Sequence, residues 1–122
     1  MSFRLKVGKT IDTDVEFDLR EGDAYSAHKV GLVLRRFDAT QFDALMQRAR
    51  DGAVDDFALL GEMIVAWRQD LVVDDADQPV AYSAEALECL CGVLGVRRLL
   101  AEKAIAAQLE GVRSAAADKQ GN

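Results

Sequence analysis

The sequence predicts an α+β fold, in which an N-terminal antiparallel β-hairpin or small sheet precedes a mostly helical part of about four helices. A change in hydrophobic spacing near residue 38 predicts this order. Before it, apolar and polar residues alternate with the two-residue period of a half-buried strand. After it, apolar residues recur at three- and four-residue steps, as on one face of a helix. No linker divides the chain, so we expect residues 1–115 to form a single domain and residues 116–122 to fray.

The first two predicted strands form an antiparallel hairpin. They cover residues 3–7 and 15–19, where apolar residues alternate with charged ones. Residues 8–14 are polar and predict a connection longer than a tight two-residue turn. The alternating apolar residues are Phe3, Leu5, Val7, Val15, Phe17 and Leu19.

A third strand is predicted over residues 28–37, after the turn at Glu21-Gly22-Asp23. Apolar residues alternate here too, but Gly31 and an unusually apolar centre weaken the pattern. A helix that begins near Tyr25 is the alternative, and periodicity alone does not separate the two.

The first two predicted helices are amphipathic. Thr40 is the expected N-cap of the first, which ends at Gly52. The second begins at Asp55 or Asp56, and its apolar positions form the most regular helical pattern in the chain. The apolar face of the first helix is Phe42, Leu45, Met46 and Ala49, and that of the second is Phe57, Leu60, Ile64, Trp67 and Leu71.

Two further helices follow an acidic loop, residues 74–79, which holds the only proline. Ser83 is the expected N-cap of the third helix, with Glu85 in its first turn and Gly95 at its end. The fourth helix spans residues 96–112, and its apolar residues cover much of its circumference, which predicts contacts on more than one side. The third helix presents Leu87, Leu90, Cys91 and Leu94, and the fourth includes Leu99, Leu100, Ile105 and Leu109.

The composition disfavours several classes of protein. With 15 basic and 21 acidic residues, the net charge is -6, whereas nucleic-acid binding requires a basic face. No apolar run is long enough to span a membrane, and no secretory signal begins the chain, so we expect a cytoplasmic protein. Cys89 and Cys91 have a spacing that suits neither a disulfide nor a shared metal site on a helix, and both are expected to be reduced and mostly buried.

No catalytic or cofactor-binding pattern is complete. Gly8-Lys9-Thr10 lacks the earlier glycine of a phosphate-binding loop, and His28 is the only histidine. The carboxylates of residues 74–77 lack the glycine and glutamate of a calcium-binding loop. We therefore expect no metal, no cofactor and no enzymatic activity; a small metal-dependent enzyme that uses these carboxylates is an alternative.

Trp67 has two interpretations. Its helical phase places it with Leu60 and Ile64, which predicts a core position. Tryptophan is also enriched among the residues that anchor protein partners, so a partly exposed anchor is the second interpretation.

The segment from Trp67 to Leu90 has a specific order. A helix that ends in tryptophan is followed by an acidic turn, by Pro79-Val80-Ala81-Tyr82-Ser83 and by a helix with leucines. Upstream, Phe3, Val15 and Phe17 lie in a strand pair, and Leu34-Arg35-Arg36-Phe37 leads into a short helix. This order, over residues 3–95, resembles the tail assembly chaperones of long-tailed bacteriophages and prophages.

The resemblance implies a non-catalytic chaperone that binds the unassembled tape measure protein. In relatives that make a longer frameshifted product, this product also recruits tail tube subunits. A structural tail component retained in the virion is the alternative from another class. We expect a homo-oligomer, because a small domain has a large surface relative to its core. We expect no contact with nucleic acid or membrane. The residues expected to bind protein are Phe57, Leu60, Ile64, Trp67, Leu99, Leu100, Ile105 and Leu109.

Overall fold

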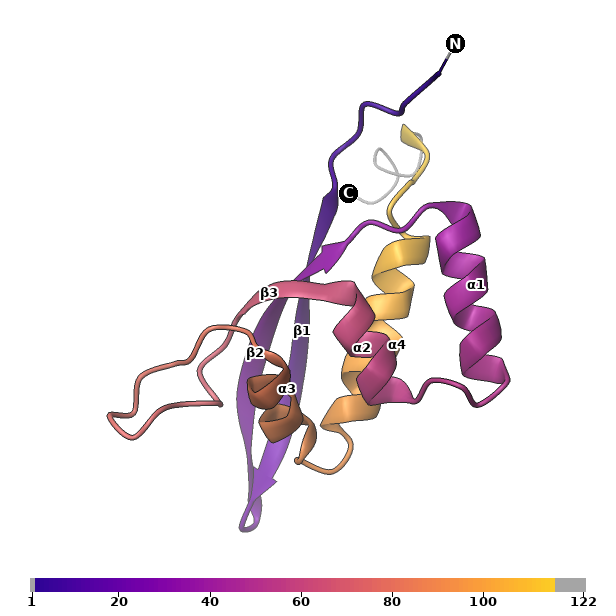
Figure 1. Cartoon of the computed structure of the whole chain (residues 1–122). Coiled ribbons are helices and arrows are strands. Elements are labelled where there is room, and N and C mark those ends of the chain that lie inside the picture. The colour runs from indigo at the N-terminus through magenta and orange to yellow at the C-terminus, as the bar shows by residue number, and fades with distance from the viewer. Residues whose placement is uncertain (1, 116–122) are drawn as a thin grey trace.

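The computed structural model describes residues 2–115 and shows a three-stranded antiparallel sheet packed against four helices (Figure 1). The strands are adjacent in the order β1-β2-β3. The predicted α+β class, with the hairpin first, is therefore confirmed. The expected frayed tail, residues 116–122, lies outside the described residues.

The hairpin differs from the predicted one. β1 (Thr10–Glu21) and β2 (Ala24–Arg35) pair along their whole length, from Thr10 opposite Arg35 to Glu21 opposite Ala24. Gly22 has a φ of 67°, as the first residue of a two-residue type II′ turn requires. The predicted strand over residues 3–7 and turn over residues 8–14 are therefore wrong. Asp12 and Asp14 suggested a turn, but they continue the same alternation on the solvent side of β1.

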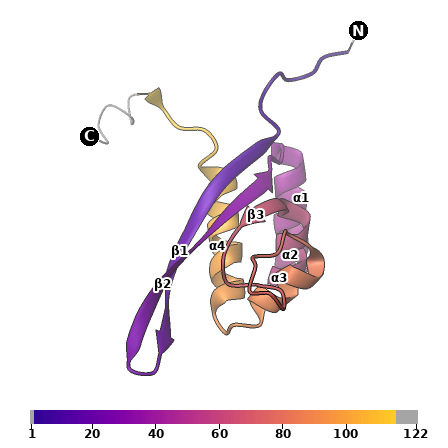
Figure 2. The ribbon, with the colours of Figure 1, turned by 90° about the vertical axis from the view of Figure 1, so that its left-hand side faces the viewer.

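The inner face of the hairpin, on the side of the helices, forms much of the core. The strand interpretation of residues 28–37 is confirmed, although β2 begins earlier and ends at Arg35. Four inner-face residues, Val15, Val30, Leu32 and Leu34, are buried. All four helices lie on this one side of the hairpin, and within residues 2–115 no helix covers the other face of the sheet (Figure 2).

The first helix, α1 (Ala39–Arg50), starts two residues earlier than expected. Asp38 rather than Thr40 is its N-cap, and a capping box joins Asp38 and Gln41 because each side chain accepts from the other's backbone N–H. Gly52, with a φ of 77°, lies just past the helix end, as predicted. Asp55 caps α2 (Asp56–Met63), which confirms the predicted start of the second helix.

The second helix was expected to continue to Leu71, and this prediction is wrong. It ends at Met63, and β3 (Ile64–Arg68) follows directly and pairs with β2. Ile64 and Trp67 are both buried although three residues apart, because the register shifts between their partners on β2. The same spacing fits one face of a helix, so the sequence pattern could not distinguish a bulged strand from a helix.

A long connection links β3 to the last two helices, and Val73 pairs with Pro79 inside it. Ser83 caps α3 (Ala84–Cys91), as predicted. Leu94 was expected on the inner face of this helix, but α3 ends at Cys91 and Leu94 is fully exposed. Gly95 then starts α4 (Val96–Leu109), which ends before the predicted residue 112. Within residues 2–115, no helix has the length and apolar character needed to cross a membrane.

Candidate protein-binding surface

The predicted binding residues are mostly part of the core. Leu60, Ile64, Trp67 and Leu100 are buried, and therefore cannot contact a partner in this conformation. Phe57, Leu99 and Ile105 are half-buried against the core. Leu109 alone of the eight is exposed, with 68% of its surface accessible.

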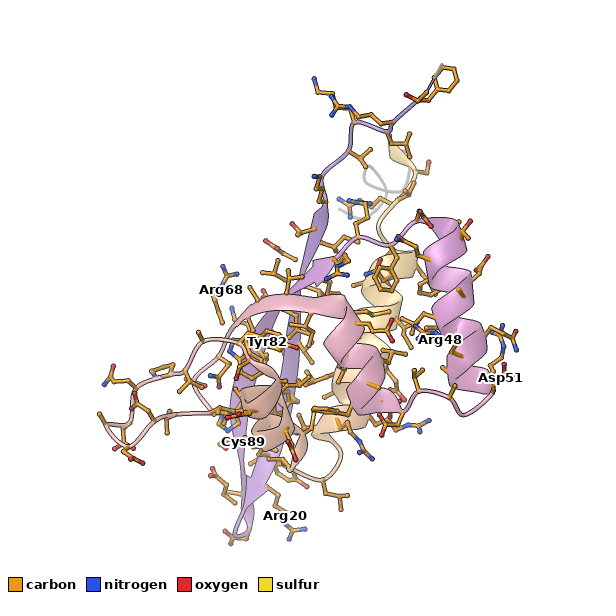
Figure 3. All side chains as sticks on the ribbon, viewed as in Figure 1. Arg20, Arg48, Asp51, Arg68, Tyr82 and Cys89 are labelled. Atoms are coloured by element: carbon orange, nitrogen blue, oxygen red, sulfur yellow. The ribbon has the colours of Figure 1, made fainter. Side chains whose placement is uncertain are left out.

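Trp67 is a core residue of β3, which confirms the first of its two interpretations. Only 8% of its surface is exposed. Its Nε1 donates to the carbonyl oxygen of Val80 at 3.0 Å, and its ring meets Tyr82 edge-on with centroids 5.2 Å apart. Figure 3 shows Tyr82 beside β3. The order of tryptophan, proline and tyrosine in the resembling segment therefore corresponds to one packed unit.

Gln69 holds this unit together, and sequence reasoning did not single it out. Its Oε1 accepts from the backbone N–H groups of Leu71 and Val72, at 2.7 and 2.6 Å. Its Nε2 donates to the carbonyl oxygens of Val72 and Val80, at 2.9 and 3.3 Å. A glutamine has no sequence signature for such a role, because the Val80 carbonyl that it shares with Trp67 reaches it only in the folded chain.

The acidic loop uses a carboxylate to shape its own backbone. Asp74 Oδ1 accepts from the N–H groups of Ala76 and Gln78, at 2.9 and 3.0 Å. Asp77 has a φ of 59°, a conformation that aspartate tolerates better than most residues. Among residues 2–115, no three His, Cys, Asp or Glu side chains are placed to hold a metal ion.

The single histidine lies on β2 and the two cysteines lie on α3. His28 is half-buried on β2, where its Nε2 is 2.9 Å from Ser26 Oγ. Cys91 is half-buried, but Cys89 is exposed, so the expectation that both thiols are mostly buried is wrong for Cys89. Burial raises the pKa of the Cys91 thiol, and the charge of Arg97 opposes this shift.

A groove lies between the start of α1 and the end of α4. Phe37, Phe42 and Leu109 supply its apolar walls, Asp38 and Asp43 its acidic rim, and its volume is roughly 340 Å³. We call this surface the α1–α4 groove. Gln108 fixes its base, because this side chain accepts from Phe37 N–H at 3.1 Å and donates to the Arg35 carbonyl at 2.6 Å.

The helix that forms one wall of the groove, α1, has few buried contacts with the rest of the domain. Leu45 is the one buried residue of this helix. Arg48 reaches from α1 to Glu62 on α2 at 2.6 Å, as its position between the two helices in Figure 3 illustrates. Both side chains are largely exposed, so this ion pair contributes at most about 1 kcal/mol. We therefore expect α1 to open at a lower free energy than the sheet.

A second exposed apolar surface lies at the turn between α3 and α4. Val93 and Leu94 project there beside Arg97 and Arg98. Leu94 precedes α4 and Leu109 ends it, so the 14-residue helix separates the two leucines by about 20 Å.

The α1–α4 groove is the stronger candidate of the two surfaces. It is concave, it has aromatic walls, and it includes Leu109 from the predicted set. Grooves of this kind accept the apolar face of a partner helix. Comparisons of the chain with protein-family models, with curated proteins and with solved structures found no match.

Proposed function

We propose that this protein is a tail assembly chaperone of a long-tailed phage or prophage, which binds the unassembled tape measure protein in the bacterial cytoplasm and catalyses no reaction. The resemblance supports the family through the order of Trp67, the acidic turn, Pro79-Val80-Ala81-Tyr82-Ser83 and the leucines of α3. Two of its expected features differ in the structure, because Trp67 lies on β3 rather than at the end of a helix and Phe3 lies outside the sheet. The observation that carries the proposal is the α1–α4 groove, a concave surface with apolar walls, an acidic rim and an exposed leucine.

The chemistry of the groove suits such a partner. A tape measure protein is a long helical chain whose apolar stripes are exposed until the tail tube encloses it, and exposed stripes of this kind promote aggregation. Phe37, Phe42 and Leu109 can cover part of a stripe, while the carboxylates of Asp38 and Asp43 favour basic residues beside it. The net charge of -6 helps to keep the complex soluble. Tail tube subunits would be a second partner if a longer, frameshifted product of this gene is also made.

Coexpression tests this function. We expect the tape measure protein of the same genome to be soluble only when this chain is present, and to co-purify with it. A genome with no long helix-rich reading frame near this gene would contradict the proposal. So would recovery of this chain from purified virions, because an assembly chaperone leaves the finished particle.

Two leucine variants locate the binding surface. Leu109→Glu places a charge in the groove, and we expect it to weaken binding at least about tenfold, because a buried unpaired charge opposes the complex. Leu94→Glu is the matched control, since it makes the same change at an exposed leucine at the other end of α4. Equal binding by both variants and the wild type would exclude the α1–α4 groove as the site.

A further inference from the structure

β1 is an unprotected edge strand. It is 12 residues long, and within residues 2–115 no strand pairs with its second edge. An edge strand of this length offers a row of unpaired backbone N–H and C=O groups, which is a template for another strand.

The two faces of β1 differ sharply in charge. On the outer face, away from the helices, four exposed acidic residues follow one another at every second position: Asp12, Asp14, Glu16 and Asp18. On β2, Lys29 lies opposite Glu16, but the positions opposite the other three are Val33, Gly31 and Ala27. The inner face carries apolar side chains, including Val15 and Phe17. A strand added at this edge would therefore need cationic residues on one face and apolar residues on the other.

Residues 2–7, the N-terminal segment, have this pattern and no partner strand. Phe3, Leu5 and Val7 alternate with Arg4 and Lys6. The three apolar side chains are 89%, 83% and 57% exposed, and the segment projects away from the domain (Figures 1 and 2).

In this structure the segment does not fold back onto the β1 edge of its own chain. A two-residue turn at Gly8-Lys9 would set Leu5 opposite Asp12, and would place the apolar side chains on the acidic face. A three-residue turn over residues 7–9 would match the two faces, with Leu5 opposite Ile11 and Arg4 opposite Asp12. Such a turn requires a positive φ at its last residue, Lys9, and Lys9 does not have one here. Arg36 also holds this point, because its Nε donates to the Gly8 carbonyl at 2.9 Å and its N–H to the Lys9 carbonyl at 2.8 Å.

We propose that the N-terminal segment of one copy adds as an antiparallel strand to the free edge of β1 in a second copy. With Leu5 opposite Val15, Phe3 faces Phe17 on the apolar side. In the same register, Arg4 lies opposite Glu16 and Lys6 opposite Asp14 on the acidic side. A second chain is free to take this register, whereas the same chain is constrained by its turn.

The pairing is reciprocal. Each chain has both a segment and an edge, so two copies satisfy each other in a two-fold symmetric dimer, in which the same contacts occur twice. The helices lie on the inner face of each sheet, which leaves the β1 edge open to the incoming strand (Figure 2). The dimer is a property of the isolated protein and does not depend on the proposed chaperone function.

Charge reversal tests the pairing. We expect the full-length wild type to sediment as a dimer at micromolar concentrations. Arg4→Glu with Lys6→Glu should raise the dimer dissociation constant at least about tenfold, because like charges then lie opposite on neighbouring strands. Adding Asp14→Lys and Glu16→Lys to the same chain should restore the dimer, because both pairs regain opposite charges. Lys29→Glu is included in this variant, because Lys29 lies opposite Glu16 on β2 and two lysines would otherwise repel within the hairpin.

The outcomes are distinct. All five substituted residues are exposed, so each variant should fold, and far-UV circular dichroism is the check. A wild type that stays monomeric up to high concentration overturns the proposal. A dimer that is insensitive to the double reversal also overturns it and points to another interface. Failure of the fivefold variant to regain the dimer excludes the stated pairing.

Discussion

Replacing Trp67 with alanine should severely destabilise the fold. The ring is 8% exposed, it meets Tyr82 edge-on, and it donates a hydrogen bond to Val80. Truncation of a large buried aromatic residue costs about 3–5 kcal/mol. The Val80 carbonyl would keep the bond from Gln69 Nε2 at 3.3 Å, so its own desolvation adds little. Since small domains are stable by about 5–15 kcal/mol, the loss is a large part of the total.

Trp67→Phe separates packing from hydrogen bonding. This variant keeps an aromatic ring but loses the Nε1 donor, so it should lose only about 1 kcal/mol from the missing bond, with a further small loss of packing. The free energy of unfolding is measured by urea denaturation, followed by far-UV circular dichroism, because Trp67 is the only tryptophan and its fluorescence disappears in both variants.

Leu109→Ala is the control for this series. Leu109 is 68% exposed, and its truncation should change the free energy of unfolding by no more than about 0.5 kcal/mol. A loss below about 1 kcal/mol in Trp67→Ala would refute the core assignment of the ring. It would also restore the alternative in which Trp67 serves a partner rather than the fold.

The remaining predictions concern α1 and the thiols. Asp38→Ala removes the side chain that accepts from Gln41 N–H at 2.7 Å, and should cost about 1 kcal/mol and lower the hydrogen-exchange protection of α1 first. Protection equal to that of the wild type, or of an Asp43→Ala control, would contradict the assigned cap. Cys89 should react with iodoacetamide faster than Cys91 at neutral pH, because Cys91 is less accessible and burial raises its thiol pKa, which lowers the thiolate fraction. Peptide mass spectrometry measures both rates, and faster labelling of Cys91 would contradict the structure.

The candidate site shows what hydrophobic spacing can predict about a binding surface and what it cannot. Leu60 and Leu100 were expected to bind a partner because they lie on regular apolar faces, but those faces form the core of this domain. Leu109 was in the same predicted set and is exposed, because α4 ends there. Periodicity identifies the apolar face of an element, whereas only the packed fold shows whether another element covers it.

The sequence by itself determined the features that depend on neighbouring residues. The fold class, the strand alternation of β2 and the caps at Asp55 and Ser83 were all predicted correctly. A cap needs a side chain within three residues of its backbone donor, and alternation needs only a two-residue period. Such local interactions can therefore be recognised directly from the sequence.

The tertiary structure alone decided the features that depend on distant partners. β1 extends back to Thr10 because Arg35 lies opposite it, and Ile64–Arg68 became a strand because β2 offered an open edge. The bonds that Trp67 and Gln69 donate to the Val80 carbonyl likewise join groups that only the folded chain brings together. The physical reason is that strand pairing and buried hydrogen bonds are satisfied between residues far apart in sequence, where a local pattern carries no information about the partner.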